Sequence, residues 1–87
     1  MAGAWKIRKY DGLDQKGEWS ISGALSEDEV CTLLQRLVSQ NLSEDEIIGA
    51  SLRRNDPRYF TLLERIGKGS PISFGHGVHY TAQFEKT

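Results

Sequence analysis

A helix-start signal occurs twice in this sequence, seventeen residues apart. The sequence reads Leu-Ser-Glu-Asp-Glu-Val at 25–30 and Leu-Ser-Glu-Asp-Glu-Ile at 42–47. Each serine can accept a hydrogen bond from the amide three residues later, and the glutamate there can accept one from the serine amide, which is a capping box. The extra acids lie where the helix dipole is positive. An acidic metal or ligand site is the alternative, but capping accounts for every one of these positions.

The spacing of apolar residues predicts a helix after each start. A helix over 27–40 has apolar residues at i, i+3, i+4, i+7 and i+8, namely Val30, Leu33, Leu34, Leu37 and Val38. A second helix is expected over 44–53, weakened by a glycine at position 49.

A third helix is predicted over 57–66. Asp56 is a suitable N-cap for Pro57 in the first turn, and Gly67 stands where a helix C-cap is common. A strand is the alternative for this segment, because Phe60, Leu62 and Ile66 share a parity.

The two ends of the chain alternate between apolar and other residues, which is typical of strands. Strands are expected over 5–10, 18–23 and 78–85, with a short one at 72–74 and a rather long hairpin loop over 11–17. Trp5, Ile7, Trp19 and Ile21 would form one apolar cross-strand cluster. A base-stacking platform made of both tryptophans and Tyr10 is the less favoured interpretation.

These elements predict a single α+β domain over 1–87. A small antiparallel sheet, built from the N-terminal hairpin and the C-terminal strand, would pack against two or three helices. The other face of the sheet would be polar, with Lys6, Arg8, Tyr10, Ser20, Ser22, His79, Thr81 and Gln83. The chain has 87 residues, of which 38% are hydrophobic and 26% charged, as is ordinary for one globular domain.

Charge is distributed unevenly along the chain. The overall net charge is −1, but residues 1–48 sum to −4 and residues 49–87 to +3. The helix caps explain most of the acidic half, whereas the basic segment 53–68 has no such explanation in the sequence. We therefore take that segment as the main candidate for a binding surface, with Arg53, Arg54, Arg58, Tyr59, Arg65 and Lys68 as its candidate residues.

The order of three helices, a glycine-rich loop and a strand resembles a winged helix over residues 26–85. This resemblance implies that the helix at 57–66 would enter the DNA major groove with Arg58 and Tyr59, and that the region 69–80 would be the wing. The charge is not basic overall, so nucleic-acid binding is the alternative function rather than the first.

Motifs for other chemistry are weak. The run Gly67-Lys68-Gly69-Ser70 lacks the spacing of a phosphate-binding loop. His76 and His79 lack further ligands nearby for a metal, and the single cysteine, Cys31, has no sequence signature of a nucleophile. We expect no catalytic residues, no metal and no cofactor.

The function expected from the sequence is a small non-catalytic binding or regulatory module that acts through protein–protein contacts. The partner would be another protein or a second copy, bound at the sheet face or edge, with Lys6, Arg8, Tyr10 and His79 as possible contacts. One cysteine and the lack of an apolar N-terminal run favour a cytoplasmic protein without membrane contact.

Overall fold

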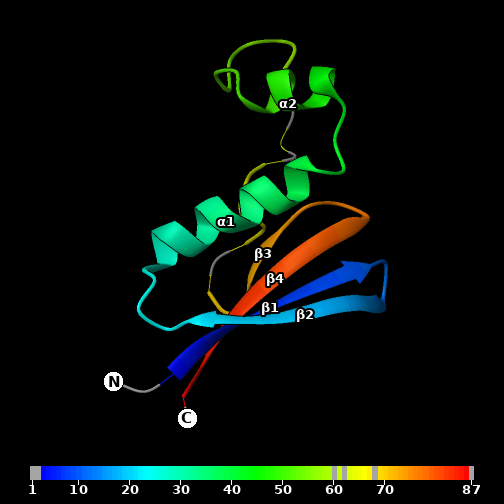
Figure 1. The fold of residues 1–87 in the computed structure, drawn as a ribbon. Helices are drawn as coiled ribbons and strands as arrows, with labels where there is room; N and C mark the ends of the chain where they lie inside the picture. Colours follow the sequence, from blue (N-terminus) through cyan, green and yellow to red (C-terminus); the bar gives the residue numbers. More distant parts are fainter. Residues whose placement is uncertain (1–2, 60, 62, 68, 87) are drawn as a thin grey trace.

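The computed structural model describes residues 3–59, 61, 63–67 and 69–86, which form a four-stranded antiparallel sheet and two helices. The elements are β1 (Gly3–Asp11), β2 (Asp14–Ser22), α1 (Glu27–Ser39), α2 (Glu44–Ala50), β3 (Ile72–Phe74) and β4 (Val78–Lys86). Across the sheet the strand order is β2-β1-β4-β3. The N-terminal hairpin and the C-terminal strands thus form one sheet, which confirms the predicted α+β class (Figure 1).

Both predicted capping boxes are present. The amide of Glu29 donates to the Ser26 hydroxyl over 3.1 Å, and the Ser26 amide donates to the Glu29 carboxylate over 2.9 Å. Ser43 and Glu46 repeat the arrangement at the start of α2, with distances of 3.2 and 2.9 Å. The repeated motif therefore marks two helix starts, as the sequence indicates.

Helix α1 packs on β4 and β3, the two strands that come after it in the chain (Figure 1). Its buried residues are Val30, Leu34 and Val38, which join a core with Ile7, Ile72, Phe74, Tyr80 and Ala82. Leu33 and Leu37 belong to the same apolar stripe but are only half-buried, because they lie on its flank. The core is therefore centred on β4 and does not extend to the β2 edge.

Helix α2 stands apart from the sheet, at the far end of α1 (Figure 1). α2 ends at Ala50 rather than at the predicted residue 53. The amide of Ser51 donates to carbonyl oxygens of the last turn and so caps the helix. Among the described residues α2 makes no extensive contact with another helix or strand. The expectation that all the helices cover the sheet therefore holds for α1 and not for α2.

The hairpin differs from its prediction in its loop. β1 continues to Asp11 and β2 begins at Asp14, so the connection is short, and Gly12 takes a φ of 63° that suits glycine. The extra length of β2 is taken up by a bulge, because Lys9 pairs with Gly17 while Tyr10 pairs with Gln15.

The prediction of a third helix over 57–66 is wrong for the residues that the structure describes there. Residues 57–59, 61 and 63–66 form turns and irregular backbone with one isolated bridge, and Phe60 and Leu62 lie outside the described residues. The Asp56 carboxylate accepts from the amide of Arg58 over 2.9 Å, which closes a local turn. Arg65 then bridges to Phe74, and the Ile66 amide donates to Ser73. Pairing with the edge of β3 thus replaces the last helical turn, and the winged-helix order loses its recognition helix.

Candidate functional site

The polar face of the sheet carries the residues that the sequence assigns to it. Lys6 pairs with Ser20 and Gln83, Arg8 with Glu18 and Thr81, and Tyr10 with His79, so their side chains share the face opposite α1. Trp5 and Trp19 lie on the other face, which rules out the stacking platform of both tryptophans with Tyr10.

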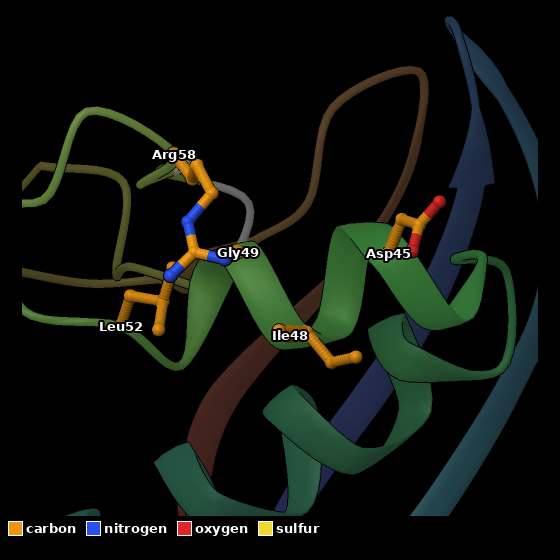
Figure 2. A pocket seen from close by; sticks show the side chains of 5 residues that line it. All are labelled: Asp45, Ile48, Gly49, Leu52 and Arg58. Carbon is orange, nitrogen blue, oxygen red and sulfur yellow. The ribbon is translucent and has the colours of Figure 1, made fainter.

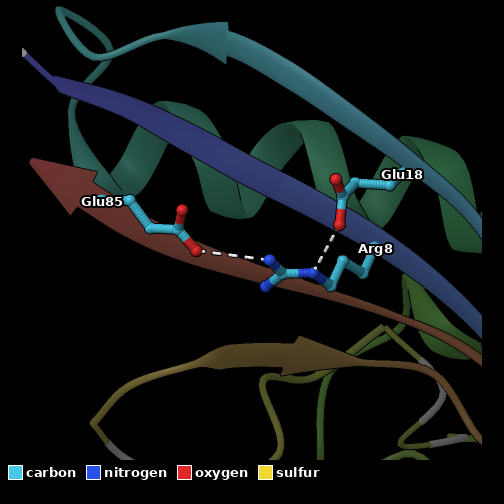
Figure 3. A network of polar contacts seen from close by, with 3 residues as sticks. All are labelled: Arg8, Glu18 and Glu85. Carbon is cyan, nitrogen blue, oxygen red and sulfur yellow. Dashed lines mark hydrogen bonds and ion pairs between the residues drawn. The ribbon is translucent and has the colours of Figure 1, made fainter. Parts of the chain in front are cut away.

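Arg8 is the centre of an ion-pair network on this polar face. Its guanidinium lies 2.8 Å from the Glu18 carboxylate on β2 and 3.3 Å from the Glu85 carboxylate on β4 (Figure 3). The hydrogen bonds to Glu18 and then Glu85 raise the pKa of Arg8 above its ordinary value. Arg8 therefore ties three strands together, and its charge is already matched by two acids.

Tyr10 and His79 form a stacked pair at one end of the polar face. Their ring centroids lie 5.3 Å apart with an interplanar angle of 13°. The His79 ring also meets the Gly77 carbonyl through Nδ1 at 3.1 Å. The two rings are nearly parallel and both residues are half-buried, so the pair offers a flat, partly exposed surface.

The basic segment 53–68 has a structural explanation that the sequence did not reveal. Arg54 pairs with Glu64, which also accepts a hydrogen bond from Tyr59, and that bond raises the pKa of Tyr59. Arg58 pairs with Asp56 over 3.4 Å. Two of the four described arginines here, Arg54 and Arg58, thus tie parts of an irregular segment together.

The remaining basic residues of the segment differ from one another in their contacts. Arg65 reaches Glu27 at the start of α1 over 3.5 Å and donates to the Gly69 carbonyl over 2.8 Å. Arg53 is exposed and makes no ion pair with the described residues. Lys68 lies outside the described residues.

A hollow of about 250 Å³ lies on α2, lined by Asp45, Ile48, Gly49, Leu52 and Arg58. In Figure 2 the Arg58 side chain crosses α2 near Leu52 and Gly49, while Asp45 lies toward the start of the helix. Because Arg58 also pairs with Asp56, its charge serves the loop that it belongs to.

Another hollow lies on α1 and includes Glu29, whose carboxylate already caps that helix.

A second hollow, of about 220 Å³, lies beside α1 on the apolar face of the sheet. It is lined by Ile7, Trp19, Ile21, Leu33 and Leu37, all of them apolar. Trp19 is 48% exposed here, although the sequence places it in the core. The sequence signal for this site is the width of the apolar stripe on α1. Leu33 and Leu37 widen the stripe beyond the part that the sheet covers, so both stay half-buried.

The described residues bring no three His, Cys, Asp or Glu side chains together as a metal site. Burial raises the pKa of the Cys31 thiol, which disfavours the thiolate needed by a nucleophile. In the part of the chain that the structure describes, no helix has the length and apolar character to cross a membrane.

Comparison with known proteins gives no relatives from which to assign a role. No protein family, no curated protein and no solved structure matches this chain. Function must therefore be argued from the surfaces described above.

Proposed function

We propose that this protein is a non-catalytic binding or regulatory module that holds an apolar helix of another protein. The observation that supports this proposal is the all-apolar hollow between α1 and the β2 edge, with its half-exposed tryptophan. Contiguous exposed apolar surface on a small domain is typical of a protein interaction site.

The width of the sheet supports a helix as the occupant. Four strands spaced by about 4.8 Å make a layer roughly 19 Å wide, and packed helices lie about 10 Å apart, so such a layer has room for two. The described chain lays one helix, α1, on this face, over β4 and β3. A partner helix beside α1 would lie over the β2 side.

The flank of α1 supplies half of a helix–helix contact. Leu33 and Leu37 are four residues apart, so they project from the same side of α1, toward the hollow. A partner helix with apolar residues at i, i+3 or i+4 and i+7 would pack against both leucines and against Trp19. Trp19 is the expected hot spot, since large aromatic side chains dominate such interfaces.

Catalysis is less well supported than binding. The described charged groups with shifted pKa values are held in structural contacts: Arg8 ties strands, Glu29 caps α1 and Asp56 closes a turn. An active site would instead gather such groups around a cavity. The hollow that we propose as the site has no titratable side chain in its lining.

The test is capture of partners from the cells that make the protein, with matched variants. Leu37→Asp places a charge in the hollow, and Leu13→Asp makes the same change at a residue that is 99% exposed in the hairpin turn. We expect one partner to be enriched with the wild type and with Leu13→Asp, and lost with Leu37→Asp. Circular dichroism checks that each variant is folded. The proposal is contradicted if the partner is enriched with Leu37→Asp as strongly as with the wild type, or if the wild type and both variants capture the same set of proteins.

Nucleic-acid binding through segment 53–68 is the alternative function. It gains no specific support, because the described arginines of this segment other than Arg53 are paired with Asp56, Glu64 or Glu27. Phosphate contacts would have to compete with these pairs.

A further inference from the structure

The sheet has one long free edge. β3 forms the other edge, but it has three residues, and the segment through Arg65 and Ile66 lies along it. β2 has nine residues, and no described strand pairs with its outer side. A strand edge of this length is a ready template for another strand.

The regular part of this edge is short and well defined. The bulge at Lys16 interrupts the ladder, so residues 17–22 form its uninterrupted part. Within it Trp19 and Ile21 pair with Ile7 and Trp5 on the α1 face. Glu18, Ser20 and Ser22 lie on the polar face.

Self-pairing of β2 is possible in few registers. In an antiparallel pair, the side chains of directly opposite residues lie on the same face of the sheet. A two-fold axis that passed between two residues would set an apolar residue of one copy opposite a polar residue of the other. The axis must therefore pass through a residue. An axis at Glu18 would set two carboxylates opposite each other, which is destabilising. An axis at Ser20 would align Lys6 of both copies in one row, separated only by serines.

An axis at Trp19 satisfies both faces. On the polar face Glu18 of one copy lies opposite Ser20 of the other, and Ser20 is itself paired with Lys6. Lys6 and Glu18 of the second copy are then two strand spacings apart, about 10 Å between backbones, which their side chains can span over the small serine. Glu18 accepts from Arg8 of its own chain through Oε1, so Lys6 of the other copy would approach Oε2. On the α1 face the two Trp19 side chains meet.

We propose that this protein forms a two-fold dimer in which β2 pairs antiparallel with β2 of a second copy, centred on Trp19. Two ion pairs, each between Lys6 and Glu18 of the other copy, flank the axis on the polar face. The contact between the two indoles covers the most exposed aromatic side chain of the sheet. The two sheets join into one continuous sheet with both α1 helices on the same side.

This proposal does not rest on the proposed function. The two proposals share Trp19, which lines the hollow and lies on the dimer axis, so they are separated at other residues. Lys6 and Glu18 lie on the polar face and do not line the hollow, whereas Leu33 and Leu37 line the hollow and are not part of β2. Loss of the dimer and loss of the partner helix can therefore be separated by variants.

The test is a charge exchange analysed by sedimentation velocity over a concentration series. Lys6→Glu alone faces Glu18 of its mate, and Glu18→Lys alone faces Lys6, so each should weaken the dimer about tenfold or more. An equimolar mixture should restore it, because each copy then meets the opposite charge. Lys86→Glu, which makes the same charge change on β4, is the control and should leave the dimer unchanged.

Glu18→Lys also removes the carboxylate that pairs with Arg8 in its own chain, so a second variant keeps the test decisive. In a Cys31→Ser background, Trp19→Cys places two thiols opposite each other on the axis, within disulfide reach. Mild oxidation should give a covalent dimer, while Ser22→Cys should not. A monomeric wild type at all concentrations overturns the proposal. So does a dimer in which the mixture restores nothing and Ser22→Cys cross-links as well as Trp19→Cys.

Discussion

Ile7 and Trp19 lie directly opposite each other across β1 and β2, yet Ile7 is 1% exposed and Trp19 is 48% exposed. The boundary of the hydrophobic core thus runs between two adjacent strands. Beyond it the apolar face continues without cover, and this uncovered part is what we assign to a partner.

This boundary predicts different costs for two truncations. Ile7→Ala removes a fully buried side chain and should lower the free energy of unfolding by about 2–5 kcal/mol. In the monomer Trp19→Ala should cost less than half as much, although it removes a larger side chain, because Trp19 is 48% exposed there. Urea unfolding of both variants measures the difference, and an equal or larger loss for Trp19→Ala would place that residue in the core after all.

The paired capping boxes predict unequal effects from equal substitutions. Ser26→Ala should lower global stability by about 1 kcal/mol, because α1 is part of the core. Ser43→Ala removes the same bonds from α2, which lies apart from the sheet, so it should fray α2 locally and change global stability less. Denaturant midpoints and amide exchange of α2 give the two readouts. Equal shifts of the midpoint would show that α2 unfolds together with the core.

Acid should loosen the helix cap and the 56–58 turn. The Ser26 amide lowers the pKa of Glu29, and the Arg58 amide lowers that of Asp56. A carboxyl with a lowered pKa in the folded state contributes stability that is complete above its unfolded pKa, near 4, and is lost as the pH falls through the folded value. Stability should therefore fall below about pH 4, and Glu29→Gln should reduce the size of this fall. An unchanged pH profile in Glu29→Gln would exclude the cap as a source.

Much of the fold is set by local patterns, which is why the sequence predicts it. The capping boxes need only residues three apart, and the alternation of β4 and of the hairpin needs only near neighbours. The polar face results from the same alternation. Segment 57–66 fails because its competitor is distant: Arg65 and Ile66 are held by Phe74 and Ser73, which no local pattern in the segment indicates.

The candidate site is harder to predict from the sequence, because it depends on which part of the apolar face of the sheet is left uncovered. Leu33, Leu37 and Trp19 have the residue types and spacing of core positions, and periodicity does not distinguish a covered face from an open one. The arginines of segment 53–68 show the reverse case. They have the composition of a binding surface, but Glu64 and Asp56 are near enough to pair with them once the chain turns.

These ion pairs predict weak binding to nucleic acid. We expect no retention of the protein on DNA or RNA columns at physiological salt, since phosphate contacts would have to displace the pairs of Arg54 and Arg58. Binding that falls steeply with salt, and that is lost on changing Arg53, Arg54 and Arg58 to alanine, would instead favour the nucleic-acid function.

Photo-cross-linking from Trp19 can show whether the hollow beside α1 holds a partner helix. A photoreactive phenylalanine derivative at Trp19 should cross-link one partner in cells, and mass spectrometry should map the site to a helix with apolar residues at i, i+3 or i+4 and i+7. The same group at Arg53, on the exposed basic segment, is the control and should give no such product. Cross-linking from the Arg53 position alone, or a Trp19 product that maps to an extended segment of the partner, would contradict a bound helix. A Trp19 product with a second copy and with no other protein would support the dimer and contradict the helix.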